Sequence, residues 1–267
     1  MTVSYMQASK DQFAGMSSAR LSIDMGDAGV LAFDQGSGSG LGTIDDKTPT
    51  AAEEIWDGLD GLTVGGLVGA AGASGVFNYV KTIAGVTFNG AARKGSGAKN
   101  SDGASSGAGQ SAWDFALTGS GDTFGVDGLA WGAGYGEAET GATSTAAGAQ
   151  SDDIHMTVFA NYSVGPVTFG AQLSEVDKGT VGAATQEATA WGIAFNVNDD
   201  LSVSYGEREV DFMKPSAAHV TESGEGVAIA YTMGSMKIAG NRNEVTANGG
   251  TTGSNDSMTE IAVSFAF

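Results

Sequence analysis

The sequence predicts an all-β protein, an antiparallel transmembrane β-barrel with about 14 strands. Three observations lead to this fold. Segments with period-two alternation of apolar and polar residues recur along the chain. Short turns and long polar linkers alternate between these segments, and no run of about 18 apolar residues is present to form a membrane-spanning helix. We expect all 267 residues to form a single barrel domain.

The predicted strands follow one another through the whole chain. We expect them at residues 1–8, 18–25, 28–34, 75–83, 85–92, 110–118, 127–137, 153–164, 166–176, 186–197, 201–211, 222–233, 235–245 and 256–267. Short turns such as Ala84-Gly85 and Gly165-Pro166 alternate with long linkers such as 35–74 and 138–152. Short turns at one end and long loops at the other are typical of outer-membrane barrels.

Each predicted strand has one uncharged apolar face. In the last strand, Ile261, Val263, Phe265 and Phe267 share a face, whereas Glu260 and Ser264 lie on the other. A charge facing lipid costs about 2–4 kcal/mol at mid-membrane, so the apolar rows predict a lipid-facing surface. The polar rows predict a wet interior. Strand 75–83 stays ambiguous, because either Asn78 or Lys81 must lie on its apolar face.

The composition excludes several classes of function. With 12 Lys and Arg against 31 Asp and Glu, the formal charge of −19 argues against a nucleic-acid partner. The charge fits either a secreted acidic protein or a channel that attracts cations. The chain has no cysteine and only two histidines, and it lacks a nucleophile motif, so we expect neither an enzyme nor a zinc site.

The linker at 36–74 is unusually long and acidic. A single lysine, Lys47, accompanies six carboxylates: Asp45, Asp46, Glu53, Glu54, Asp57 and Asp60. Thr50 and Glu53 have capping-box spacing and Gly58 offers a stop, which predicts a short helix. Two interpretations remain open at this point. The segment either folds into a pore and presents carboxylates to solute, or it is a solvated surface loop.

The same carboxylates suggest one candidate metal. Asp45, Asp46, Glu53 and Glu54 would be the ligands of a Ca²⁺ ion, which takes six to eight oxygens. The spacing of an EF-hand is missing. Apart from this Ca²⁺, no cofactor is expected.

Two stretches of this sequence resemble alphaproteobacterial general-diffusion outer-membrane porins. The first runs from Met25-Gly26-Asp27 through strand 28–34 into SGSGLGTIDDKTPTAAEEIWDGL, and the second is the final strand that ends at Phe267. The resemblance implies a 16-stranded, trimeric barrel in the outer membrane of a Gram-negative bacterium, with segment 36–74 as the third loop that narrows the channel. It also implies that about two N-terminal strands are missing here. The alternative is a complete 14-stranded barrel.

The resemblance further implies a passive channel for small hydrophilic solutes. Rings of carboxylates favour cations in narrow pores, so the acidic loop predicts a cation preference. The partners of the channel would be cations, membrane lipid, lipopolysaccharide and two further copies of the chain. Phe267 would serve as the assembly signal, and a basic cluster on the pore wall would face the loop, with Arg20, Lys81 and Arg208 as candidates. Two rivals remain: a substrate-specific channel of the same fold, and a secreted acidic β-sandwich or adhesin without a pore.

Overall fold

The computed structural model consists of one antiparallel sheet of 14 strands. It describes residues 1–9, 16–36, 38–59, 70–72, 74–95, 111–139, 152–179, 185–213 and 218–266. Helical structure in these residues is limited to four short 3₁₀ turns, η1 (Gly26–Ala28), η2 (Gly40–Thr43), η3 (Gly121–Thr123) and η4 (Asn248–Gly250). No helix in the described ranges has the length and apolar character to cross a membrane.

The observed strands confirm the predicted ones to within a few residues. They are β1 (Thr2–Ser9), β2 (Met16–Asp24), β3 (Val30–Gln35), β4 (Ser74–Ile83), β5 (Val86–Arg93), β6 (Ala112–Ser120), β7 (Leu129–Ala138), β8 (Asp153–Val164), β9 (Val167–Asp177), β10 (Thr185–Asn196), β11 (Leu201–Met213), β12 (Val220–Met233), β13 (Met236–Thr246) and β14 (Asp256–Phe265).

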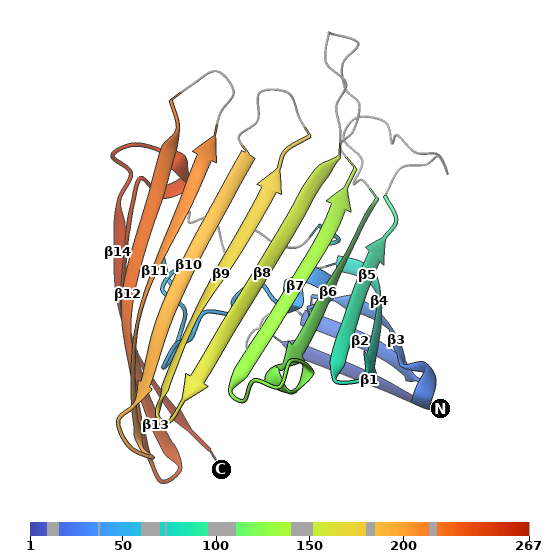
Figure 1. The fold of residues 1–267 in the computed structure, drawn as a ribbon, viewed down its shortest axis with the longest axis horizontal. Coiled ribbons are helices and arrows are strands. Elements are labelled where there is room, and N and C mark those ends of the chain that lie inside the picture. Colours follow the sequence, from blue (N-terminus) through green and yellow to red (C-terminus); the bar gives the residue numbers. More distant parts are fainter. Residues whose placement is uncertain are drawn as a thin grey trace.

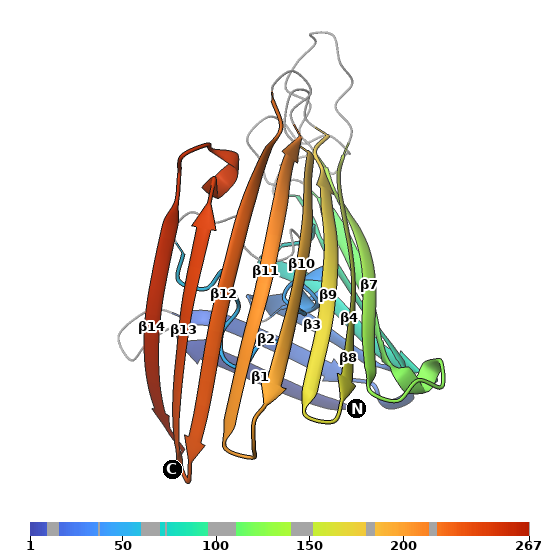
Figure 2. The same cartoon turned by 60° about the vertical axis from the view of Figure 1, so that its left-hand side comes forward.

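Every strand pairs with the next along the chain, and β1 and β14 are the two ends of the sheet order. The sheet curls, so that β1–β3 cross the molecule at a steep angle to β9–β12 (Figures 1 and 2). Tight turns join strands at one end. In one of them Ile83 pairs with Val86, and the two turn residues Ala84 and Gly85 have φ of 50° and 81°. Positive φ at both positions matches the twist of a tight hairpin.

The two faces of the sheet differ as the alternation predicts. Large apolar side chains stand exposed on the outer face, among them Leu173 (52%), Ile229 (49%) and Phe265 (57%). The aliphatic rows therefore do not pack against one another in a dry centre. Residues of the opposite parity, such as Gln172 and Asn241, face inward and are largely polar or small.

The register also shows on which face of the sheet Lys81 lies. Asn78 lies inward, where its side chain donates hydrogen bonds to Asn89 Oδ1 and to the carbonyl of Gly90. Lys81 has the opposite parity and shares the outer face with Phe77 and Tyr79. The prediction of Lys81 as a pore-wall residue is therefore wrong. The Asn78 amide, which hydrogen-bonds to its buried neighbours, occupies the inward position. Lys81 lies on the outer face, close to the turn at Ala84.

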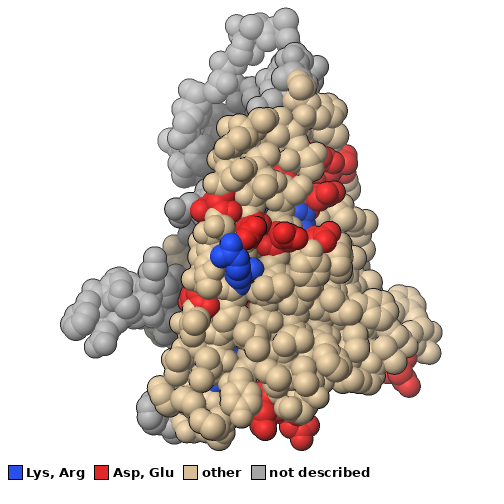
Figure 3. Space-filling model, turned by 90° about the vertical axis from the view of Figure 1, so that its left-hand side faces the viewer, with Lys and Arg blue, Asp and Glu red and all other residues tan. Residues whose placement is uncertain are grey.

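Charged residues return to the outer face toward the end of the sheet that carries the long connections. Glu207 on β11 lies opposite Glu225 on β12, which in turn lies opposite Glu244 on β13. Figure 3 shows acidic side chains in a band across one side of the molecule, with a wide uncharged surface below it. Alternation alone did not predict this band, although the band continues the same rows of outward residues. It marks one border of the apolar surface.

We expect Ile229→Arg to destabilise the folded protein by about 2–4 kcal/mol, because the guanidinium would lie in the middle of the apolar face. Urea unfolding in phosphatidylcholine vesicles measures this cost. The matched control is Ser202→Arg, because Ser202 faces inward on the neighbouring strand, next to the Val203 that lies opposite Ile229. Equal losses for the two variants would contradict the assignment of the faces.

Candidate pore constriction

The acidic segment crosses the inner face of the sheet. We call residues 36–74 the constriction loop; the structure describes 36, 38–59, 70–72 and 74 of it. Its backbone is held by side chains that point inward from six strands, namely Asn89, Asp114, Asn161, Gln172, Ser204 and Asn243. Backbone N–H and C=O groups removed from water need partners, and the polar rows supply them. The surface-loop interpretation is therefore wrong for the described part of the loop.

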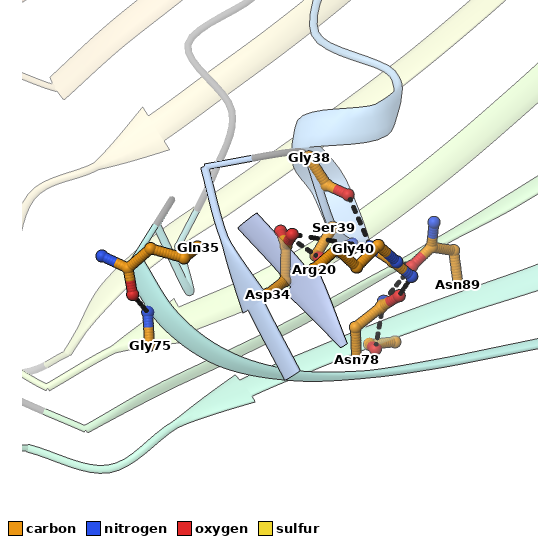
Figure 4. A network of polar contacts seen from close by, with 10 residues as sticks. Arg20, Asp34, Gln35, Gly38, Ser39, Gly40, Gly75, Asn78 and Asn89 are labelled. Carbon is orange, nitrogen blue, oxygen red and sulfur yellow. Dashed lines mark hydrogen bonds and ion pairs between the residues drawn. The ribbon is translucent and has the colours of Figure 1, made fainter. Parts of the chain in front are cut away.

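A polar network fixes the start of the loop (Figure 4). Arg20 on β2 lies 3.7 Å from Asp34, its cross-strand neighbour on β3. Asp34 accepts a hydrogen bond from the Ser39 hydroxyl at 2.8 Å, and Arg20 donates to the carbonyl of Gly38 at 3.4 Å. Arg20 also donates to Asn78. Since the three wall residues lie on three strands, the loop leaves the sheet in a fixed direction.

One carboxylate joins the two limbs of the loop. Asp114 accepts a hydrogen bond from the backbone N–H of Leu41 at 3.1 Å and another from that of Ala71 at 2.7 Å. The approach requires glycine at position 40, because a Cβ there would lie 1.7 Å from Asp114 Oδ1. Gly40 also has a φ of 56°, which favours glycine.

Gln172 holds residues 44–47, which we call the acidic corner of the loop. Its amide nitrogen donates to the carbonyls of Ile44 at 2.9 Å and Asp45 at 3.1 Å, and its oxygen accepts from the Lys47 N–H at 2.9 Å. The Lys47 carbonyl in turn accepts a hydrogen bond from Asn161. This part of the chain is therefore fixed against β8 and β9, with the side chains of Asp45 and Asp46 half-exposed.

The far part of the loop contacts β11, β12 and β13. Asn243 donates to the carbonyls of Glu54 at 3.0 Å and Asp57 at 2.9 Å. The ring of Trp56 lies over the guanidinium of Arg208, 5.4 Å from it, and Arg208 is buried against Glu222 at 3.3 Å. Such a cation–π contact gains strength when the cation is desolvated.

The predicted helix at Thr50 is wrong. The Thr50 hydroxyl accepts from the N–H of Ala52 and donates to the carbonyl of Glu53, and residues 55–58 form a single turn. In a capping box the hydroxyl would accept from the N–H of Glu53 instead. A turn forms here instead of a helix, because Asn243 donates hydrogen bonds to two carbonyls of the segment and Gly58 has a φ of 70°.

Burial and mutual repulsion raise the proton affinity of two loop carboxylates. Burial, and then the charge of Asp46, raises the pKa of Asp45 to about 6. Burial first, then the charges of Asp46, Glu53 and Asp57, raises the pKa of Glu54. Asp46 is paired with Lys47 at 3.2 Å, the one loop carboxylate with an ion pair among the described residues. Asp60 lies outside the described residues. The acidic side chains thus gather closely enough to influence one another.

The predicted basic residues do not form one cluster. Arg20 and Arg208 lie on β2 and β11, and each is engaged by a carboxylate of the wall, Asp34 and Glu222 respectively. Both act on the loop directly, Arg20 at Gly38 and Arg208 at Trp56. The predicted site residues did not include the other wall residues that hold the loop, namely Asp34, Asn89, Asp114, Asn161, Gln172, Ser204, Glu222 and Asn243. Their inward parity on predicted strands was the available signal.

Two further predictions have different outcomes. No group of three or more carboxylates or imidazoles in the described ranges is placed to hold a metal ion, so the structure gives no support to Ca²⁺ at Asp45, Asp46, Glu53 and Glu54. Phe267 lies outside the described residues, and its role in assembly stays a prediction.

The chain resembles outer-membrane proteins of known structure. It matches an anion-selective porin from Comamonas acidovorans at 13% identity with a TM-score of 0.64, covering 95% of this chain and 79% of that one. It matches OmpF from Salmonella typhi, in complex with daunomycin, at 11% identity and 0.62, covering 95% and 79%. It matches OmpT from Vibrio cholerae at 14% identity and 0.61, covering 94% and 78%. No protein-family model and no curated protein sequence matches. The chain therefore has the fold of these β-barrel proteins.

We expect Gln172→Ala to release the acidic corner of the loop, because three hydrogen bonds to its backbone are lost. At about 1 kcal/mol for each net bond, the N–H of Lys47 should exchange with deuterium at least about fivefold faster. Hydrogen exchange with mass spectrometry measures the change. Thr168→Ala, on the same face of β9, is the control, because its hydroxyl bonds to Ser163. Unchanged exchange at Lys47 would contradict the role of Gln172.

Proposed function

We propose that this chain forms a passive diffusion channel for small hydrophilic solutes and ions, with a preference for cations, in the outer membrane of a Gram-negative bacterium. The observation that carries the proposal is the acidic loop held on the polar inner face of a curled sheet whose outer face is apolar. Solute would diffuse down its gradient past the loop. Permeation involves no group transfer, because the width and charge of the pore select the solute.

The cation preference rests on the residues of this chain and not on its fold. One protein of the same fold is described as anion-selective, so the architecture permits either preference. Within the loop, Asp45, Glu53, Glu54 and Asp57 are accompanied by Lys47, which is paired with Asp46. At physiological salt the screening length is about 8 Å, so charges at the constriction outweigh those elsewhere.

The wall arginines strengthen this argument. Arg20 and Arg208 are each held next to a carboxylate, and Arg208 is also covered by Trp56. Their positive charge is therefore largely offset before it reaches a permeating ion. The loop carboxylates then dominate the field at the constriction, which favours cations over anions.

Assembly and partners follow from the same proposal. The apolar outer face would contact membrane lipid, and lipopolysaccharide would surround the end that carries the long connections. We also propose a homotrimer, as the resemblance implies. The β-sandwich alternative is wrong, because all described strands belong to one sheet. A substrate-specific channel of the same fold is the second candidate, and liposome swelling with solutes of graded size would separate it from a general channel.

Replacing Glu53, Glu54 and Asp57 with amides should lower the permeability ratio of K⁺ over Cl⁻ by about half or more, because the charges nearest to the permeating ion are removed. Reversal potentials in planar bilayers under a salt gradient report this ratio. The matched control removes three carboxylates at the short-turn end, Asp122, Asp199 and Asp200. A triple loop variant with the wild-type reversal potential would reject the proposed constriction.

The cation preference should also depend on pH. Asp45, with a pKa of about 6, is mainly ionised at pH 7.5 and mainly neutral at pH 5. Acidification removes its negative charge, and Glu54, whose pKa is also raised, follows in the same direction. The K⁺ over Cl⁻ ratio should therefore fall between pH 7.5 and 5. Asp45→Asn should reduce this step, and an identical pH response in that variant would exclude Asp45 as its source.

A further inference from the structure

A groove of about 470 Å³ lies on the outer face of the sheet, over β7–β10. Its outward side chains include Tyr135, Met156, Leu173, Glu175 and Glu187. The residues between them in sequence, such as Thr157 and Ser174, point inward and are buried, so that their backbone forms the floor. The groove is therefore separate from the constriction loop and opens toward the surroundings of the barrel.

Two carboxylates line the groove at its end nearer the long connections. Glu175 on β9 lies directly opposite Glu187 on β10, and Glu187 lies opposite Asp211 on β11. Like charges directly opposite one another destabilise a sheet. None of the ion pairs formed by the described residues involves Glu175 or Glu187. A positive charge placed between these two carboxylates would remove the repulsion.

The apolar part of the groove lies below the carboxylates. One step down each strand from the carboxylate row lie Val158 and Leu173. The next row consists of Trp131, Ala160, Ala171 and Trp191, each opposite the next. We call the strip of the outer face with two small alanines between two tryptophans the trough; it lies next to the groove and is not part of its lining. On its β10 side this row ends opposite Glu207, a member of the acidic band, whereas down β8 and β9 the trough leads to Tyr162 and Phe169 on the apolar face.

We propose that this groove binds an amphiphile with a single alkyl chain and a cationic amine head group. The ammonium would lie between Glu175 and Glu187, and the chain would run past Leu173 over Ala160 and Ala171. The charge complementarity favours this occupant over an anionic lipid, which would meet two carboxylates. Because lipid tails already cover the apolar face, the alkyl chain contributes van der Waals packing in the trough, and the two carboxylates supply the selectivity for the head group. Binding at this site is independent of conduction through the pore.

Quenching of tryptophan fluorescence tests the site, because Trp131 and Trp191 flank the trough. The probe is dodecylammonium with bromine near the chain end, added to the full chain in phosphatidylcholine vesicles. We expect saturable quenching that is at least tenfold weaker for brominated dodecyl sulfate. Glu175→Gln with Glu187→Gln should weaken ammonium binding about tenfold, as two exposed ion pairs are lost. Quenching by an uncharged brominated dodecyl maltoside should be unchanged, which shows that the variant is folded.

The matched control is Glu225→Gln, a carboxylate in the same outer band on β12, which should leave ammonium binding unchanged. Equal quenching by ammonium and sulfate probes in the wild type would overturn the proposal in favour of bulk lipid contact. Binding of the sulfate probe that requires Mg²⁺ and is lost with EDTA would overturn it in favour of a cation-bridged anionic lipid. A conductance defect bears on the channel and leaves this binding result unaffected.

Discussion

The need to satisfy a buried backbone governs this structure more than any single contact. A loop laid across the inside of a sheet removes its N–H and C=O groups from bulk water, and each unpaired group costs free energy. The inward rows of Asn, Gln, Ser and Asp supply the missing partners from β5 to β13. The same alternation that turns aliphatic side chains outward thus provides the polar surface that holds the loop. A change of register by one residue would destroy both functions at once.

Much of the fold was predictable because its signal is local. Period-two alternation and turn chemistry placed all 14 strands to within a few residues. The face of 75–83 was not predictable, because Asn78 and Lys81 are both polar and only the cross-strand partners of Asn78 decide between them. Acidic residues on the outer face were likewise missed, since alternation alone does not show where along a strand lipid gives way to water.

The candidate site was predictable in its location and less so in its detail. Composition identified the acidic loop, and the resemblance implied its place against the wall and the candidates Arg20 and Arg208. The helix at Thr50 was wrong, because tertiary hydrogen bonds from Asn243 outweigh a local capping pattern. The prediction of a basic cluster was wrong for a related reason. Parity places a residue on a face, whereas the distance between β2 and β11 around a curled sheet depends on closure, which no local pattern encodes.

The buried pair of Arg208 and Glu222 limits the changes that the connection after β13 can accept. Glu222 accepts the N–H of Gly249 at 2.7 Å through its second oxygen, so one carboxylate joins the segment after β13 to the arginine beneath Trp56. Gly250 packs so tightly on Phe212 that a Cβ would lie 2.6 Å from the ring. Residues 247–250 are thus tied to the acidic loop through Glu222, Arg208 and Trp56. Insertions here would disturb Arg208 and the loop more than insertions in a connection anchored only to its own hairpin.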